Sequence, residues 1–323
     1  MFNQFSIDSK NFDGPILITG AGGCIGGWVL ALLSKANVPV IAFDLSENKS
    51  RLKLLMSVEE IAKITWLTDD ITNTQAVSEA VKKNGVRSII HLAALQVPFC
   101  IADPIAGAKV NVVGTVNIFE AARQNNLKRL VYASSVCAHG LLSKSTYKAT
   151  LYGAYKLCNE NTAHIYYQDW NVPSIGIRPG IVYGVGRDQG LTSKTTVATL
   201  AAAANTPYTI PFSGPISALH AGEVAAAFIK AVSKERDGTA VFDMNGVFTT
   251  VEEWVNILQK IEPKARINIK GEALSFPFHL SDEPLRDYIG SYETMDLEPG
   301  IEQTFHTFKE LLSRGEISTD NLN

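Results

Sequence analysis

The chain has 323 residues, of which 46% are apolar and 19% charged, so it is long enough for about two globular domains and is unlike a disordered or collagen-like protein. Lys and Arg number 29 against 32 Asp and Glu, and the net charge of −3 lacks the basic excess typical of proteins that bind nucleic acid. We therefore expect a folded protein whose partners do not include nucleic acid.

Short apolar segments rich in β-branched residues alternate with longer, helix-compatible stretches through the first half of the chain. The predicted strands are residues 15–19, 38–43, 64–67, 86–91, 129–134 and 174–178, with a seventh at 240–244. Parallel strands need long crossover connections, and this alternation supplies them. The pattern predicts an α/β fold, a doubly wound parallel sheet covered by helices on both faces.

Beyond residue 178 the pattern becomes irregular, with a glycine-rich polar stretch at 184–194, an alanine-rich helix at 195–204 and a proline-containing segment at 207–215. A helix at 221–232 and the seventh strand then return to the sheet. We expect a sheet domain of residues 1–183 and 214–246, and a smaller, discontinuous α/β lobe of residues 184–213 and 247–323 that faces the substrate.

A glycine-rich turn follows the first predicted strand and leads into a helix. Gly20 permits the tight turn, Gly23 lets a pyrophosphate approach the backbone, and Gly26 lets the helix pack closely on the strand. The first N–H groups of such a helix have no partner within it and attract an anion. The segment predicts a dinucleotide-binding turn.

An acidic residue stands where a dinucleotide site needs one. Asp44 closes the second strand 24 residues after Gly20, close to the offset of roughly 20 residues at which an acid binds the adenosine ribose hydroxyls. A carboxylate repels a 2′-phosphate and so favours NAD over NADP. Lys49 and Arg51 lie close to Asp44 in the sequence, so NADP is not excluded as the cofactor.

Tyr152 and Lys156 are four residues apart, so on a helix their side chains share one face. A nearby ammonium stabilises a phenolate and lowers the tyrosine pKa from its usual value of about 10. Tyr152 would then remove the proton of an alcohol as hydride leaves for a nicotinamide. Ser135, at the end of the fifth strand, is placed to hold the reacting oxygen.

Together these motifs resemble an extended short-chain dehydrogenase/reductase of the NAD-dependent epimerase/dehydratase family. Residues 19–26 are similar to its Thr-Gly-x-x-Gly-x-x-Gly turn, with Cys24 where an aromatic residue is usual, and residues 91–94, 132–135 and 178–184 resemble its strand ends beside the cofactor. The resemblance implies a Rossmann fold, an NAD-dependent oxidoreductase or epimerase, and a homodimer formed by helices near 104–124 and 152–169.

The resemblance also implies roles for individual residues. Asp70 and Ile71 would contact the adenine, and Asn111 would support the active site. The implied catalytic residues are Ser135, Tyr152, Lys156 and Asn111. The implied cofactor-binding residues are Gly20, Gly23, Cys24, Ile25, Gly26, Asp44, Asp70, Ile71, Leu92, Ala93, Ala94, Tyr152, Lys156 and Pro179.

Departures from the family pattern bear on the reaction. Members that eliminate water or decarboxylate carry an acid one or two residues beyond the active-site Ser or Thr, because those reactions need a further proton transfer. Val136 and Cys137 stand there in this chain, which favours oxidation, reduction or epimerisation. His139, where the family usually has Tyr, is interpreted as a loop residue.

Other departures bear on the substrate. Many members bind nucleotide-diphosphate sugars with an Asn after the sixth strand, where this chain has Ile181, and with an Arg-Asp pair before a later His, which His220 lacks. Between residues 179 and 230 only Arg187 and Lys194 are basic, which is sparse for holding a diphosphate. We expect a smaller substrate without the nucleotide.

The polar loop after the sixth strand is the best candidate for contacting that substrate. Arg187 is suited to a carboxylate or to vicinal hydroxyls, and Thr192 and Ser135 complete the expected substrate contacts. The alternative for this loop is a solvated polar segment without a ligand.

The leading hypothesis is an NAD-dependent enzyme that oxidises a secondary alcohol of a sugar-like or sugar-acid-like molecule. Such an enzyme either releases NADH as a dehydrogenase or returns the hydride as an epimerase, and the sequence does not separate the two. The enzyme alternatives are an NADPH-dependent ketone or aldehyde reductase and a nucleotide-sugar epimerase. A nucleotide-sensing regulator without catalysis is disfavoured by the intact Tyr152 and Lys156.

The cysteines bear on the compartment. Cys24, Cys100, Cys137 and Cys158 are widely spaced and form neither a CxxC pair nor a zinc-binding cluster, which predicts reduced thiols and no metal site. The first fourteen residues lack a basic start followed by an apolar run, and no stretch approaches the roughly 18 apolar residues that a membrane span requires. We expect a soluble, cytoplasmic protein without a membrane partner.

Overall fold

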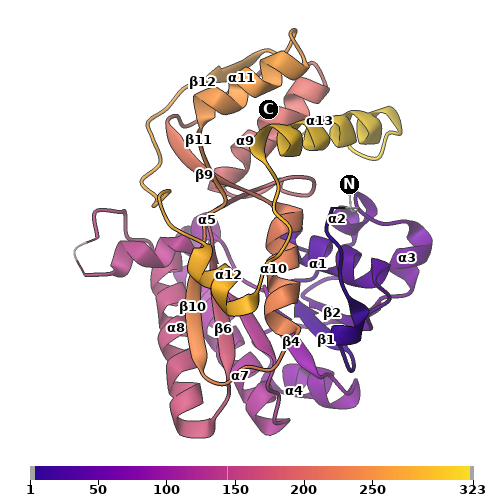
Figure 1. The fold of residues 1–323 in the computed structure, drawn as a ribbon, viewed down its shortest axis with the longest axis vertical. Helices are drawn as coiled ribbons and strands as arrows, with labels where there is room; N and C mark the ends of the chain where they lie inside the picture. Colours follow the sequence, from indigo (N-terminus) through magenta and orange to yellow (C-terminus); the bar gives the residue numbers. More distant parts are fainter. Residues whose placement is uncertain (1–3, 144, 321–323) are drawn as a thin grey trace.

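A seven-stranded, fully parallel sheet forms the centre of the computed structural model, which describes residues 4–143 and 145–320 (Figure 1). Its strands are β1 (Ile16–Thr19), β2 (Val40–Asp44), β3 (Thr65–Thr68), β4 (Ser88–His91), β5 (Leu130–Ala133), β6 (Ser174–Pro179) and β10 (Thr239–Met244). Their order across the sheet is β10-β6-β5-β4-β1-β2-β3. All seven predicted strands are present, and the predicted doubly wound α/β fold is confirmed.

Long helices connect the strands and cover both faces of the sheet. They are α1 (Cys24–Lys35), α4 (Thr74–Lys83), α7 (Gly114–Gln124), α8 (Leu151–Trp170) and α10 (Ala221–Val232). Successive side chains of a strand face opposite sides. Accordingly, Ile16 and Ile18 of β1 join the hydrophobic cluster of α1 and α10, whereas Leu17 joins that of α4 and α7. All of β1 is buried, which explains why its sequence is a continuous apolar run.

The second lobe lies over one end of the sheet (Figure 1). β7 (Ile181–Tyr183), β9 (Pro215–His220) and β11 (Val247–Thr250) form a three-stranded sheet, and β8 (Tyr208–Ile210) pairs with β12 (Ile267–Ile269). The helices of this lobe are α9 (Lys194–Ala203), α11 (Val251–Ile261) and α13 (Leu297–Ser313), whereas α12 (Glu283–Ile289) packs against β10 of the main sheet. Trp254 and Phe305 are almost fully buried in its hydrophobic cluster.

Shorter elements complete the chain. They are the helices α2 (Ser50–Lys53), α3 (Val58–Ala62), α5 (Val97–Ala102) and α6 (Pro104–Ala108), the 3₁₀ turns η1 (Ser9–Asn11), η3 (Val136–Leu141) and η4 (Leu191–Ser193), and the π-helical turn η2 (Lys109–Val113). Cys24, Cys100, Cys137 and Cys158 are all free thiols, as expected. Among the helices of residues 4–143 and 145–320, none has the length and apolar character needed to cross a membrane.

The helices expected at 195–204 and 221–232 correspond to α9 and α10, and β10 returns to the main sheet. β7 and β9 fall inside the part of the chain that the sequence assigns to the sheet domain, yet they pair with each other in the separate three-stranded sheet. The division at residues 183, 213 and 246 therefore stays a proposal, with β7 and β9 as the elements that join the two parts.

A buried carboxylate lies where α10 meets the C-terminal segment. Glu223 is 2% exposed and accepts a hydrogen bond of 3.2 Å from the Met295 N–H, while the Arg286 guanidinium is 4.0 Å away. Asp282 takes the closer contact with Arg286, at 2.9 Å. Burial raises the pKa of Glu223 from 4.5 to about 7. Between these values the folded protein holds a proton that the unfolded chain has lost, so this group makes stability fall as the pH rises.

Glu223→Gln removes this pH dependence while it keeps an oxygen that accepts the Met295 N–H. We expect the variant to exceed the wild type in unfolding free energy by about 1–3 kcal/mol near pH 8, with the gain disappearing towards pH 4.5. Urea unfolding at both ends of this range measures the difference, and Glu253→Gln, on the exposed face of α11, is the matched control. An equal gain at both ends would contradict the assignment.

Candidate active site

A cleft of about 530 Å³ opens at the carboxyl ends of β1, β2, β4, β5 and β6. In a doubly wound sheet the strand order reverses next to β1, and the connections on either side diverge to leave a crevice there. The cleft brings together all the predicted cofactor and substrate contacts: Gly20, Gly23, Cys24, Ile25, Gly26, Asp44, Asp70, Ile71, Leu92, Ala93, Ala94, Ser135, Tyr152, Lys156, Pro179, Arg187 and Thr192.

The glycine turn has a geometry that side chains would not allow. Gly20 has a φ of +67°, and a Cβ at Gly26 would lie 2.2 Å from the Gly20 carbonyl oxygen. Gly23 is the N-cap of α1 and has no side chain to bond the first N–H groups of the helix. These N–H groups therefore face the cleft as an anion site, and the turn fits the pyrophosphate of NAD.

Asp44 is held in place at the end of β2 by two backbone contacts. Its Oδ2 accepts the Gly22 N–H at 2.8 Å, and its Oδ1 accepts the Leu45 N–H at 2.8 Å. A carboxylate fixed at this strand end beside the glycine turn is suited to ribose hydroxyls and repels a 2′-phosphate.

Lys49 and Arg51, the two cations that could bind the 2′-phosphate of NADP, already have acidic partners. Lys49 pairs with Glu47 at 2.7 Å, and Arg51 pairs with Asp188 at 2.6 Å. Arg51 also donates to the Gly22 carbonyl at 2.9 Å. Because both charges are engaged within the protein, the local electrostatics favour NAD.

Asn111, implied by the resemblance to be a catalytic residue that supports the active site, does not line the cleft. It lies in the π-helical turn η2, where its amide accepts the Leu95 N–H at 3.1 Å and donates to the Leu95 carbonyl at 3.0 Å. Its own carbonyl accepts a hydrogen bond from the Asn159 amide at 2.9 Å. Asn111 is thus a positioning residue that joins α8 to the segment after β4, rather than a residue that touches substrate.

The helix α8 presents the predicted base and lysine to the cleft. The Thr150 hydroxyl caps the helix by accepting the Gly153 N–H at 3.0 Å, so Tyr152 and Lys156 lie on one face at its start. The Lys156 Nζ donates to the Ala133 carbonyl at 2.6 Å and lies 5.5 Å from the centre of the Tyr152 ring. Lys156 is 2% exposed, and this burial lowers its pKa from 10.5 to about 8.

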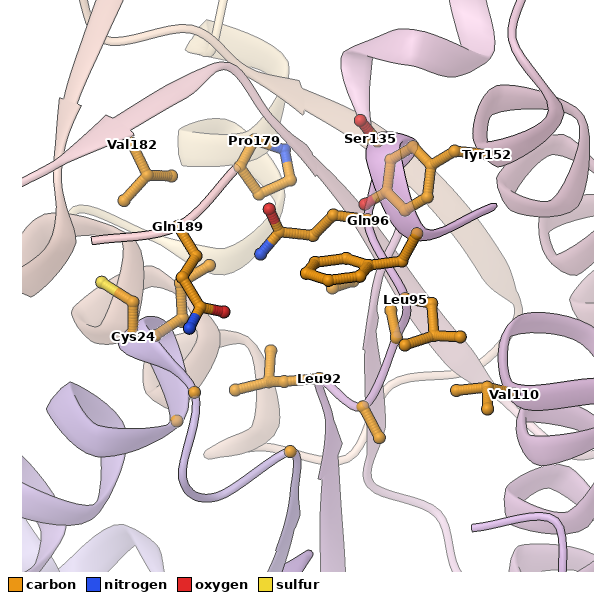
Figure 2. A pocket seen from close by; sticks show the side chains of 18 of the residues that line it. Cys24, Leu92, Leu95, Gln96, Val110, Ser135, Tyr152, Pro179, Val182 and Gln189 are labelled. Atoms are coloured by element: carbon orange, nitrogen blue, oxygen red, sulfur yellow. The ribbon is translucent and has the colours of Figure 1, made fainter. Parts of the chain in front are cut away.

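The side chains of Tyr152 and Ser135 lie near each other at the wall of the cleft, beyond the end of β5 (Figure 2). Burial raises the pKa of Tyr152, and the Ser135 hydrogen bond and the Arg187 charge oppose that rise. Ser135 Oγ accepts the Cys137 N–H at 3.1 Å, which fixes the hydroxyl between the loop and the tyrosine. Ser135 and Arg187 therefore join Lys156, whose ammonium lies beside the Tyr152 ring, in favouring the phenolate.

A buried polar network lies directly behind this set. Glu160 accepts hydrogen bonds from the Ser134 hydroxyl and from Arg178, whose Nε lies at 2.7 Å. His139 is not a free loop residue, because its Nε2 contacts Asp243 at 2.7 Å, and Asp243 also faces Arg178 at 3.6 Å. The network ties the ends of β5, β6 and β10 to α8, so the strand end that carries Ser135 is fixed.

Arg187 lies between the catalytic end of the cleft and the glycine turn. Its Nη2 donates to the Thr192 hydroxyl at 3.1 Å, and its Nε is buried without a hydrogen-bond partner among the described residues. Burial lowers the pKa of Arg187, whereas charge on the nearby Cys24 and Tyr152 side chains would raise it. A partly buried guanidinium that lines the cleft without an acidic partner is suited to an anionic ligand.

The cleft is also lined by residues that the sequence motifs do not single out, among them Gln96, Gln189 and Phe276. Gln96 follows the end of β4, and Gln189 belongs to the polar loop, so their places after cofactor-side strands were the available signal. Phe276 has no such signal, because it comes from the segment between β12 and α12, far along the chain.

Comparison with known proteins gives a family match and several structural neighbours. The model of the NAD dependent epimerase/dehydratase family matches residues 16–245. An uncharacterised protein of Methanocaldococcus jannaschii is 32% identical over 184 residues, which cover 52% of this chain and 56% of that protein. The chain spans about half the length of the curated relatives it matches.

Two solved structures share the whole architecture. The UDP-glucose 4-epimerase of Thermotoga maritima, solved with UDP-glucose, matches with a TM-score of 0.78 and 20% identity over 92% of this chain and 99% of that chain. The L-threonine dehydrogenase of Clostridium difficile matches with a TM-score of 0.77 and 20% identity over 94% of this chain and 99% of that chain. At this level of identity the likeness concerns the fold.

Lys156→Met tests whether the buried ammonium is kept at the expense of stability. Below pH 8 the folded protein keeps Lys156 charged, and burial of this charge lowers the free energy of unfolding. Between pH 8 and 10.5 the unfolded chain still binds the proton whereas the folded protein has lost it, so the stability of the wild type rises with pH. We expect the variant to be more stable near pH 7 by about 1–2 kcal/mol, after loss of the bond to Ala133, and less active.

Urea unfolding near pH 7 and near pH 10 measures this difference, which should shrink as the pH rises. Lys53→Met, on an exposed part of α2, is the control and should change little at either pH. A Lys156→Met protein that is less stable than the wild type near pH 7 would contradict the assigned cost.

Proposed function

Because the chain belongs to the NAD-dependent epimerase/dehydratase family, we propose that it oxidises a secondary alcohol of a small, anionic, sugar-like substrate by hydride transfer. The NAD cofactor expected from Asp44 is confirmed at the level of this family. The single observation that carries the choice of substrate is the charge of the cleft. Its cations are Arg51, Lys156 and Arg187. Arg51 pairs with Asp188 and Lys156 is held against the Ala133 carbonyl, whereas Arg187 forms no ion pair among the described residues.

Different residues of the cleft have different roles in the oxidation. NAD, when bound, accepts the hydride from the alcohol carbon. Tyr152 Oη takes the alcohol proton, and the Ser135 hydroxyl holds the same oxygen in line with it. Ser135 stays oriented because the Cys137 N–H occupies one of its lone pairs. Lys156 holds positive charge beside the phenol while its other contact, to the Ala133 carbonyl, fixes its position.

The second lobe supports a substrate without a nucleotide. Phe276 is the one described residue beyond Thr192 that lines the cleft, and it brings no charge. Holding a diphosphate normally requires several cationic or bidentate donors. The L-threonine dehydrogenase neighbour indicates that this fold also serves small substrates, although the UDP-glucose 4-epimerase neighbour was solved with a nucleotide sugar.

An epimerase is the second candidate, and the Arg51–Asp188 ion pair favours it. The pair joins α2 to the loop after β7 at the edge of the cleft, where it would slow exit of a dinucleotide. Because the Asp188 side chain is 59% exposed, the pair adds at most about 1 kcal/mol to that barrier. Purified protein that retains NAD and turns over without added cofactor would favour the epimerase, and steady NADH release would favour the dehydrogenase.

A homodimer also belongs to the proposal. Exposed apolar side chains gather on helices α5, α6 and α8, including Ile101, Ile105, Ile165 and Trp170. Exposed apolar patches of this kind are typical of protein interfaces. Of these helices, α6 and α8 lie in the segments near 104–124 and 152–169 that the family resemblance assigns to the dimer, and sedimentation of the purified chain tests the assignment.

NADH formation across sugars, sugar acids and nucleotide sugars tests the proposed reaction. We expect a hit among the sugar acids, because their carboxylate suits Arg187, and we expect Tyr152→Phe to lower kcat by about 100-fold or more. Side-by-side titration of NAD and NADP should show preference for NAD. Activity confined to nucleotide sugars would contradict the substrate assignment, and full activity of Tyr152→Phe would contradict the role of the base.

A further inference from the structure

Two glutamine side chains approach each other in the cleft, with Gln96 between Tyr152 and Gln189, and Gln189 on the side of Cys24 (Figure 2). Gln96 is the N-cap residue of α5, and Gln189 belongs to the loop between β7 and η4. Both amides project towards the middle of the cavity from opposite walls. We refer to Gln96 and Gln189 as the carboxamide pair.

The carboxamide pair has donors and acceptors available for a ligand. Within the described part of the chain, neither side-chain amide makes a hydrogen bond, and the Gln96 side chain does not cap α5. Each amide offers two N–H donors and one carbonyl acceptor. A hydroxyl group both donates and accepts, so it is complementary to such an amide on either side.

Gly190 brings the carboxamide pair next to the anion site. Its φ of +95° is one that side chains rarely adopt, and a Cβ there would lie 2.1 Å from Gln96 Oε1 and 3.3 Å from Arg187 Nη2. The Gln96 carbonyl and the Arg187 guanidinium therefore border the same point. A ligand whose carboxylate reaches Arg187 places the substituents of its neighbouring carbons against Gln96.

The walls around these polar groups are largely apolar. Leu95, Val97, Val182, Leu191 and Phe276 line the same cleft and offer no side-chain hydrogen bonds. A ligand with an unsubstituted carbon chain would cover the two amides and leave them without partners, which costs free energy. A ligand with hydroxyls on successive carbons would satisfy both.

We propose that the carboxamide pair makes the enzyme selective for polyhydroxylated acids, with Gln96 and Gln189 binding hydroxyls along a chain whose carboxylate is held by Arg187. This inference rests on the proposed function and narrows its substrate class to acyclic or cyclic sugar acids. The glutamines are specificity residues, because neither is placed to move the proton that Tyr152 takes.

Calorimetric binding to the NAD-saturated protein tests this selectivity directly. The probes are the six-carbon aldonates gluconate, galactonate and mannonate, with 2-hydroxyhexanoate as the acid of equal length that lacks the further hydroxyls. We expect at least one aldonate to bind the wild type about 10-fold more tightly than 2-hydroxyhexanoate. Equal or better binding of 2-hydroxyhexanoate, or no aldonate binding, would overturn the proposal.

Gln96→Leu and Gln189→Leu keep much of the side-chain volume but remove the amides. We expect each to lower the ratio of aldonate to 2-hydroxyhexanoate affinity by about 5- to 10-fold. Gly190→Ala leaves both amides in the chain but displaces the Gln96 oxygen, and it should lower the same ratio. Gln259→Leu, on the exposed face of α11, is the matched control and should leave the ratio unchanged.

An unchanged ratio in Gln96→Leu, Gln189→Leu and Gly190→Ala, with NAD affinity confirming that each is folded, would overturn the role of the pair. A different result would contradict the proposed reaction itself. If aldonates are oxidised in a Tyr152-dependent manner while the three variants keep the ratio, only the carboxamide pair is wrong. If no anionic alcohol yields NADH in the wild type, the proposed function itself is wrong.

Discussion

The partly buried guanidinium of Arg187, which forms no ion pair among the described residues, is the constraint on which the arrangement of the cleft depends. A charge taken out of water costs several kcal/mol unless a partner compensates it, and the partners that this chain supplies are few. Thr192 accepts one N–H, while the Nε has no acceptor among the described residues. The Arg51–Asp188 pair and the left-handed backbone of Gly190 hold the loop in a position that keeps Arg187 inside. An anionic ligand would supply the negative charge that Arg187 lacks among its protein neighbours.

A second buried cation shapes the chemistry at the other side of Tyr152. Lys156 lies against the Ala133 carbonyl with its pKa lowered by burial, and Glu160, one turn further along α8, opposes that lowering. Glu160 in turn joins the strand ends of Ser134 and Arg178. Positive charge therefore approaches the phenol from the helix and from the polar loop, and the nearby Ser135 hydroxyl also acts to lower the pKa of Tyr152.

Local patterns were enough to predict the sheet, the glycine turn and most of the cleft. β1 is a continuous apolar run because both of its faces are buried, and the Tyr152–Lys156 spacing has meaning only on a helix such as α8. These local patterns could not predict contacts between residues far apart in the sequence. His139 meets Asp243 across 104 residues of sequence, and Phe276 reaches the cleft from the second lobe. Asn111 was predicted as a site residue from the family resemblance alone. Its hydrogen bonds to Leu95 show that it is a positioning residue, which the sequence pattern could not reveal.

The central claim is that Arg187 receives the single negative charge of a substrate without a nucleotide. Calorimetric titration of UDP and of the six-carbon aldonates into NAD-saturated protein, repeated with Arg187→Ala, tests it most directly. The account predicts no measurable UDP binding, and aldonate binding by the wild type that weakens by about 10-fold or more in the variant, the loss typical of a charge-assisted hydrogen bond. Micromolar UDP binding, or undiminished aldonate affinity in Arg187→Ala, would contradict it.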